Sequence, residues 1–263
     1  MHQRIRAGLL AFGTATALTL GWTATPALAG PPAAAAPDGH VIALHLRPDG
    51  SGRIDSWTPA GGVSAQQLYA MLKAQGIPDL VDPASRSQIN EPPTCSINGA
   101  WALDERCGNN RWHYAGTHPR VNIMDQTSAG WPVHTKSDKW NTSTAIDTIY
   151  HWYTQYSCTG TSNCVWVMNG NYGPTGWVGY TSFFVGTTPL VLTGASIDLN
   201  DYCAPGYVCS SGFAHASTAC HELGHALGLD HNTFKSSCLY YQPGAATTDN
   251  PSTSDFQMLD SIY

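Results

Sequence analysis

Three histidines near the C-terminal end of the chain constrain its fold more than any other feature. The run reads His221-Glu222-Leu223-Gly224-His225-Ala226-Leu227-Gly228-Leu229-Asp230-His231. On a helix, residues four apart lie on one face about one turn apart, so His221 and His225 can reach one ion. Gly228 is suited to end the helix in a left-handed conformation, and His231 then arrives from outside the helix. The spacing therefore predicts a helix, a reversal and three converging imidazoles.

Three imidazoles suit a zinc ion that keeps one open position, as catalytic sites do and closed structural sites do not. Glu222 is rotated by roughly 100° from His221 on the helix, so it can reach a water held on the metal without taking a ligand position. We expect His221, His225 and His231 to bind one zinc ion and Glu222 to act as general base.

The run matches the pattern H-E-x-x-H-x-x-G-x-x-H of the metzincin zinc peptidases, and it most resembles the matrixin and snapalysin-like branches. Ser196–Asn200 also resembles the strand before the active-site helix of that family, and Ser252–Tyr263 resembles its C-terminal helix. The resemblance covers about residues 95–263. It implies an α+β, zincin-like domain with a twisted mixed sheet, an active-site helix and a C-terminal helix, which hydrolyses peptide bonds in proteins.

The sequence departs from the family in the turn beneath the metal. Leu239 stands where the family carries a methionine that packs under the site without binding the ion. Tyr241 matches a tyrosine that in some members hydrogen-bonds the oxyanion, and a packed aromatic is the alternative. Snapalysin-like members can use Asp as third ligand at the last position of the motif, but here His231 occupies it and Asp230 stands beside it.

The N-terminus has the layout of a secretory signal peptide over residues 1–29. Arg4 and Arg6 precede a mostly apolar stretch, and Ala27-Leu28-Ala29 is a small-x-small cleavage site. The apolar stretch is short and interrupted, so a membrane anchor fits less well. We therefore expect a secreted protein with no membrane contact after cleavage.

Residues 30–93 contain no cysteine and lead into a cysteine-bearing part over residues 94–263. In an exported hydrolase this division suggests a pro-segment, and a permanent N-terminal extension is the alternative. Many matrixins are kept latent by a pro-segment cysteine, which this segment lacks. An inhibitory segment would have to block the site sterically or present another ligand such as Asp79 or Asp82.

All eight cysteines follow residue 94, which in an exported chain indicates disulfides. Pairing of sequential neighbours is our hypothesis, although eight cysteines allow 105 connectivities. It gives the bonds Cys95–Cys107, Cys158–Cys164, Cys203–Cys209 and Cys220–Cys238. The last of these would tie the metal-bearing helix to the turn and compensate for the missing methionine.

The periodicity of the chain predicts strands and helices in mixed order, which indicates an α/β or α+β layered domain. Expected strands cover residues 41–46, 53–57, 120–125 and 164–168, and two further segments, 190–192 and 196–200, are separated by a break at Gly194. Residues 176–185 fit either a strand or a loop. Expected helices cover residues 64–76, 143–156, 216–227 and 252–262. An extended peptide could pair with the edge of residues 190–199.

Other features exclude partners or offer weaker sites. Removal of Arg4 and Arg6 moves the formal net charge from −6 to −8, and no Lys/Arg cluster remains, so nucleic acid is excluded as a partner. We expect a monomer that acts on proteins or peptides. Five further histidines could include a second metal site, although no pair among them has ligand spacing: His113, His118, His134, His151 and His215. The oxygen-rich residues Asp198, Asn200 and Asp201 could bind calcium, but a strand end and a turn is the simpler interpretation.

Three alternative hypotheses accept the motif but assign the protein a different function. The first is an exported zinc-binding or adhesion module with a peptidase-like fold and no activity, in which Glu222 would have no purpose. The second is a disulfide-stabilised structural protein without metal. A zinc hydrolase acting on a non-peptide bond is the third.

Overall fold

The computed structural model describes residues 39–86, 96–97, 100–102, 111–113, 116–159, 162–186, 191–203, 212–241 and 246–263. The chain divides into residues 1–32 and 33–263, and every described residue belongs to the second unit. The expected signal peptide lies outside the described residues. No helix within the described ranges is both long and apolar enough to cross a membrane.

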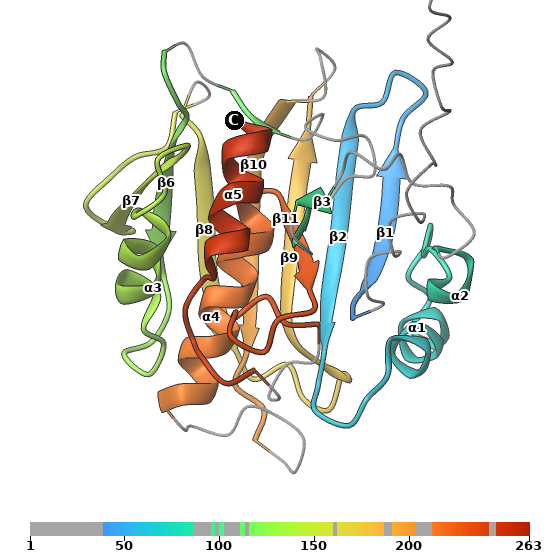
Figure 1. Cartoon of the computed structure of the whole chain (residues 1–263). Helices are drawn as coiled ribbons and strands as arrows, with labels where there is room; N and C mark the ends of the chain where they lie inside the picture. Colours follow the sequence, from blue (N-terminus) through green and yellow to red (C-terminus); the bar gives the residue numbers. More distant parts are fainter. Residues whose placement is uncertain are drawn as a thin grey trace, which may run out of the picture. The chain divides into compact units, whose positions relative to one another are not determined.

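The main element of the fold is one mixed sheet with its strands in the order β1-β2-β9-β10-β8-β6-β7 (Figure 1). A further short strand, β5, pairs with β10 beside this path. Strands β10, β8, β6 and β7 are parallel neighbours, whereas β1, β2, β9 and β10 form antiparallel pairs. The strands are β1 Val41–Leu46, β2 Gly52–Pro59, β5 Arg111–Trp112, β6 Arg120–Asp125, β7 Asp147–Trp152, β8 Cys164–Gly170, β9 Trp177–Val185 and β10 Val191–Asn200.

A small second sheet and five helices complete the described structure. The small sheet has the order β11-β4-β3, with β3 Ser96–Ile97, β4 Ala100–Ala102 and β11 Leu229–Asn232. Helices α4 and α5 lie in front of the main sheet in Figure 1, and α4 contacts β9 and β10. The helices are α1 Ala65–Ala74, α2 Pro83–Arg86, α3 Val133–Trp140, α4 Gly212–Ala226 and α5 Thr253–Ile262.

These elements confirm the expected α+β fold, including the helix before the reversal and the C-terminal helix. Ser252 caps α5 in a capping box with Asp255. Leu223 of α4 packs with Ile197 and Leu199 of β10 in one apolar core. The helix that carries the two expected ligands is thus held against the middle of the sheet.

The helix expected over residues 143–156 is wrong. Residues 147–152 form β7, parallel to β6, and the connecting helix is α3, which precedes it. A parallel pair needs its crossover between the two strands, and a helix commonly supplies it. Thr148, Ile149 and Tyr150 are β-branched or aromatic and favour a strand, so the helical spacing of the apolar residues was misleading.

The break expected at Gly194 is also wrong, because β10 runs without interruption from Val191 to Asn200. Only its register with β9 shifts, between Leu192 and Gly194. A bulge can absorb a glycine without ending a strand. Since β10 is paired with β9 on one side and β8 on the other, it offers a peptide substrate no free edge.

The N-terminal hairpin joins the main sheet. Strands β1 and β2 are connected by a turn at Gly50, as expected, and β2 pairs with β9 over its whole length. Helix α1, capped by Ser64, packs Leu68 and Leu72 into a second apolar cluster with Trp57. The division of the chain at residue 93 stays a prediction.

Two aromatic side chains cap the C-terminal carbonyls of α4. The indole Nε1 of Trp112 donates to the Ala226 oxygen at 2.9 Å, and the hydroxyl of Tyr263 donates to the Leu227 oxygen at 2.9 Å. The last carbonyls of a helix have no partner within the helix, so these bonds satisfy groups that would otherwise be buried unpaired. They fix the point at which the chain leaves α4.

Replacement of Tyr263 by Phe should lower the free energy of unfolding by about 1 kcal/mol, because the Leu227 carbonyl loses its donor. Urea denaturation followed by tryptophan fluorescence measures the change. Tyr153→Phe, at an exposed ring, is the control and should leave the midpoint unchanged. Equal midpoints for both variants would contradict the capping role.

Candidate metal centre

The structure brings His221, His225 and His231 together as predicted. Helix α4 places the first two one turn apart, Gly228 reverses the chain with a φ of 96°, and β11 delivers the third. One ring nitrogen from each lies within 4.8 Å of those of the other two, and the Nε2 atoms of His221 and His231 are 2.9 Å apart. All three side chains are buried.

Hydrogen bonds to main-chain carbonyls orient two of the imidazoles. The Nδ1 atom of His221 donates to the Cys238 oxygen at 2.7 Å, and that of His225 donates to the Leu229 oxygen at 2.8 Å. Because a carbonyl only accepts, each Nδ1 carries the proton and each Nε2 keeps its lone pair. Burial lowers the pKa of His221 to about 4, so this ring is neutral near pH 7. Neutral imidazoles whose Nε2 atoms carry a lone pair fit a zinc ion.

Glu222 is buried beside its histidine neighbours. The hydroxyl of Thr181 donates to its Oε2 atom at 2.5 Å, whereas Oε1 has no hydrogen-bond partner among the described residues. A Cβ atom at Gly179 would lie 2.1 Å from Oε1, so β9 must carry glycine at this point. An unpaired buried acceptor next to a ligand set is suited to hold a water molecule.

Burial raises the pKa of Glu222 to about 7, and the hydroxyls of Thr181 and Thr58 act in the opposite direction. Thr58 belongs to β2 and lies near the carboxyl group, but its hydroxyl makes no hydrogen bond of good geometry. A carboxyl group with a pKa near neutrality can both take up and release a proton, which general acid–base catalysis requires.

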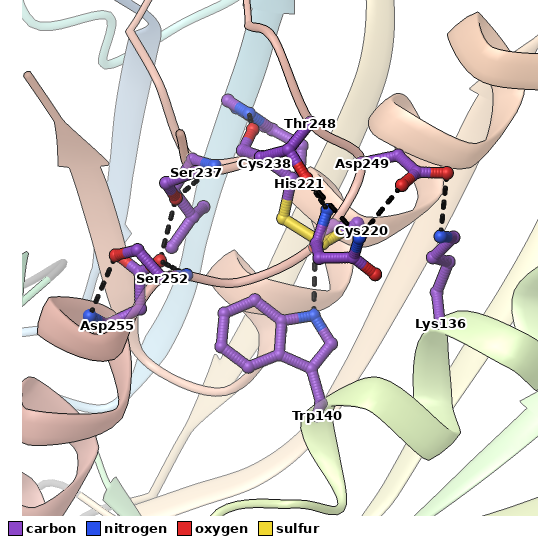
Figure 2. The surroundings of a disulfide bond; sticks show 12 residues. Lys136, Trp140, Cys220, His221, Ser237, Cys238, Thr248, Asp249, Ser252 and Asp255 are labelled. Carbon is purple, nitrogen blue, oxygen red and sulfur yellow. Dashed lines mark hydrogen bonds and ion pairs between the residues drawn. A yellow bond between two sulfur atoms is a disulfide. The ribbon is translucent and has the colours of Figure 1, made fainter. Parts of the chain in front are cut away.

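The turn under the histidines is tied to α4 by the Cys220–Cys238 disulfide, as hypothesised (Figure 2). Leu239 occupies the position expected from the family and is fully buried. A Cβ atom at Gly224 would lie 2.9 Å from its Cδ2 atom, so glycine on α4 permits this close approach. Leucine therefore packs beneath the site in place of methionine.

Asp255 of α5 anchors the same turn from below. Its carboxylate accepts hydrogen bonds from the hydroxyl of Ser237 at 2.7 Å and from the side-chain amide of Asn232 at 2.7 Å. Figure 2 shows Asp255 beside Ser237 and Ser252, and Trp140 of α3 below Cys220. The indole of Trp140 donates to the Cys220 oxygen at 3.0 Å. Helices α3 and α5 thus both support the site.

Tyr241 follows this turn, but nothing tests its expected oxyanion role. Its amide donates to the Asn232 oxygen at 3.1 Å, and its ring lies 4.7 Å from that of Tyr240. Its hydroxyl bonds to that of Tyr240 and raises the pKa of Tyr240. The role stays a prediction.

The remaining disulfide hypotheses are confirmed only where the residues are described. Cys158 and Cys164 form a disulfide as expected. Cys203 is disulfide-bonded, whereas Cys95, Cys107 and Cys209 lie outside the described residues.

The weaker candidate sites are occupied by structural contacts. Asn200 is fully buried and bonds to main-chain groups around residues 172–177, Asp198 accepts from Tyr172, and Asp201 accepts from Trp131. Three of the histidines stack on aromatic rings: His215 on Trp131, His134 on Tyr150 and His151 on Tyr156. His118 lies near the carboxylate of Asp147, and His113 is exposed. None of these residues belongs to a group of metal-binding geometry in the described part of the chain.

His40 is the residue at the site that the sequence did not predict. Its Nδ1 atom lies 3.1 Å from Nδ1 of His231 and 3.3 Å from a carboxylate oxygen of Asp230, and its side chain is fully buried. His40, Asp230 and His231 form a second group with metal-binding geometry, which shares His231 with the first. Position 40 precedes the first strand, far from the motif in sequence, and no local pattern links the two.

The comparisons with known proteins give a family match and, among solved structures, a likeness with a low TM-score. The family model described as Peptidase_M10, matrixin, matches residues 100–263. No curated protein sequence matches significantly. The crystal structure of metalloproteinase-II from Bacteroides fragilis is similar with 12% identity over 82% of this chain and 75% of that chain, at a TM-score of 0.31. The assignment to a family therefore rests on the family model and not on the structural likeness.

Removal of the Cys220–Cys238 bond by alanine substitution of both residues should lower the free energy of unfolding by about 3 kcal/mol, because the bond closes an 18-residue span. It should also weaken zinc retention, since the carbonyl that orients His221 belongs to Cys238. The control is the double alanine variant of Cys158 and Cys164, which span 6 residues. Equal zinc retention by the two variants, measured by competition with a chelator, would contradict the role of the brace.

Replacement of Glu222 by Gln should stabilise the chelator-treated protein increasingly as pH rises. The pKa of Glu222 is raised from 4.5 to about 7 in the folded state, so the wild type loses stability as pH rises from 4.5 through 7. The gain should grow by about 3 kcal/mol between pH 4 and pH 8. Titration of His221 affects both proteins equally and cancels. Urea denaturation at several pH values measures the difference, and a constant difference would contradict a buried, titrating carboxyl group.

Proposed function

The chain belongs to the matrixin family, and from this premise we propose that it is a secreted zinc-dependent endopeptidase. The observation that carries the proposal is the donor set: three buried imidazoles beside a carboxyl group with an unpaired oxygen. In two of these rings, His221 and His225, hydrogen bonds from Nδ1 to carbonyls leave Nε2 unprotonated. This set matches what hydrolysis by an activated water requires.

The residues of the proposed site have distinct roles. His221, His225 and His231 would hold a single zinc ion, which when bound supplies Lewis-acid polarisation of a carbonyl and of a water molecule. Glu222 takes the proton of the attacking water at Oε1 and then passes it to the nitrogen of the leaving amine. Its raised pKa suits both transfers. Tyr241 is the proposed donor to the oxyanion.

Secretion and substrate class complete the proposal. The signal-like residues 1–29 and the disulfides suit an exported, oxidised protein. Proteins or peptides are the proposed substrates, and the active form is a monomer. Incubation with a diverse peptide library, with and without a chelator, followed by mass spectrometry, tests the activity. Products that form equally well in the presence of the chelator would exclude a metallopeptidase.

Substitution of Glu222 by Gln should reduce peptide hydrolysis by at least about 100-fold while the bound zinc is retained, because the amide cannot accept the water proton. Product formation by mass spectrometry and zinc content by elemental analysis measure the two effects. Asp138→Asn, at an exposed carboxylate on α3, is the matched control and should be unaffected. Zinc binding without hydrolysis in the wild type under every condition would favour an inactive binding module instead.

A further inference from the structure

We propose that a pocket on the face of the main sheet opposite α4 binds an organic cation, an alkylated ammonium or a guanidinium group, between aromatic rings and the carboxylate of Asp198. The pocket has a volume of about 300 Å³, which suits a small molecule or a single side chain. Its lining includes Asp198 of β10 and four aromatic residues: Trp57 of β2, Tyr172 between β8 and β9, and Trp177 and Tyr180 of β9.

The pocket and the histidine cluster lie on opposite faces of the sheet. Successive side chains of a strand point to opposite faces. Thr181 of β9 donates to Glu222 of α4, so its neighbour Tyr180 points away from this helix. Ile197 of β10 packs in the main core, so Asp198 also points away. Since α4 lies in front of the sheet in Figure 1, a ligand in the pocket would lie behind it, apart from the proposed zinc site.

Four aromatic rings form a continuous row along the pocket. The rings of Trp57 and Tyr180 are stacked, with centroids 5.0 Å apart and planes inclined by 19°. Trp177 lies 6.2 Å from Tyr180 and 5.1 Å from Tyr172, tilted against both rings. Trp57 and Trp177 are nearly buried, whereas Tyr172 is 41% exposed, so the row leads from the interior to the surface. The electron-rich faces of such rings attract a cation that has lost part of its water.

Asp198 supplies the pocket with a carboxylate that has no cationic partner among the described residues. Its Oδ1 atom accepts a hydrogen bond from the hydroxyl of Tyr172 at 2.5 Å. Burial raises the pKa of Asp198, the bond from Tyr172 acts in the opposite direction, and no positive charge contributes. A half-buried carboxylate without a counter-ion is destabilised in its charged form, and a bound cation would remove this cost.

The other charged groups of the pocket are already paired. Asp55 is almost fully buried and lies 3.0 Å from a ring nitrogen of His45 and 2.9 Å from the guanidinium of Arg53. The second ring nitrogen of His45 lies 3.0 Å from the exposed carboxylate of Asp79. Because Arg53 neutralises Asp55, the charge that is left uncompensated in the pocket is that of Asp198. This balance favours a cation over an anion or a neutral ligand.

An organic cation fits the pocket better than a metal ion does. Asp198 belongs to no group of three metal-ligating side chains in the part of the chain that the structure describes. Calcium takes about six to eight oxygen ligands, whereas an alkylated ammonium needs only aromatic faces and one negative charge. A guanidinium group meets the same conditions, since it stacks on rings and pairs with carboxylates. The group can come from a free quaternary ammonium compound or from an arginine side chain of a peptide.

Isothermal titration calorimetry of the whole chain with choline and with its neutral isostere 3,3-dimethylbutan-1-ol tests the pocket. The two probes have the same shape and differ in charge, so we expect choline to bind at least about tenfold more tightly. Nα-acetylarginine amide is titrated in parallel, and the cation that binds more tightly identifies the source of the group. The measurement needs neither zinc nor a peptide substrate, so its result does not depend on peptidase activity.

Two positions in the pocket provide variants with matched controls. Asp198→Asn keeps an acceptor for Tyr172 but removes the charge, and it should weaken choline binding at least about tenfold while binding of the alcohol is unchanged. Tyr172→Leu removes the ring at the mouth and should also weaken choline binding, whereas Tyr172→Phe should retain it. Asp138→Asn and Tyr153→Leu, at an exposed carboxylate and an exposed ring elsewhere, are the controls. Circular dichroism verifies that each variant is folded.

Several results would overturn the cation site. Absence of binding by both cations, equal affinities for choline and the alcohol, or tighter binding of the neutral sugar cellotriose would reject the role of charge. Unchanged choline affinity in Asp198→Asn would remove the carboxylate from the site. Should that variant not fold, equal losses of affinity in Tyr172→Leu and Tyr172→Phe, or none in Tyr172→Leu, would reject the contribution of the ring.

Discussion

The site depends on two hydrogen bonds from imidazoles to main-chain carbonyls, which fix the orientation of the rings. They connect His221 to Cys238 and His225 to Leu229, and both acceptors lie after α4 in the chain. The ring orientations therefore depend on where the backbone returns beneath the helix. The Cys220–Cys238 disulfide and the carboxylate of Asp255 determine that path. Side-chain geometry at the centre is thus set by backbone positions that the surrounding fold makes rigid, because the carbonyls that accept from the imidazoles fix the orientation of each ring.

Glycines allow the helix, the sheet and the turn to approach closely enough for this arrangement. Gly179 lets β9 reach the Glu222 carboxylate, and Gly224 lets Leu239 press against α4. The same close packing removes water from Glu222 and raises its pKa. A buried carboxyl group of this kind destabilises the folded protein above its ordinary pKa. Proton transfer near neutral pH and reduced stability are therefore two consequences of one packing arrangement.

The sequence predicted what depends on local spacing and missed what depends on long-range pairing. One helix and one reversal bring His221, Glu222, His225 and His231 within reach, so the eleven residues 221–231 contain the whole signal. Residues 143–156 carry apolar side chains that suit a helix or a strand, and only the parallel pairing with β6 decides in favour of β7. His40 lies 191 positions from His231. Its contact follows from the register of β2 on β9, for which no short motif exists.

Pairing with β2 also covers an edge of β9 that would otherwise be exposed. An unpaired edge strand exposes a row of amides and carbonyls and invites association with other chains. An extended peptide can bind to such an edge by strand addition. Strand β2 satisfies those main-chain groups from within the molecule. Its apolar side chains are divided between the two clusters: Ile54 packs in the main core, and Trp57 packs with Leu68 and Leu72 of α1 and with Trp177 of β9, so β2 is anchored on both sides.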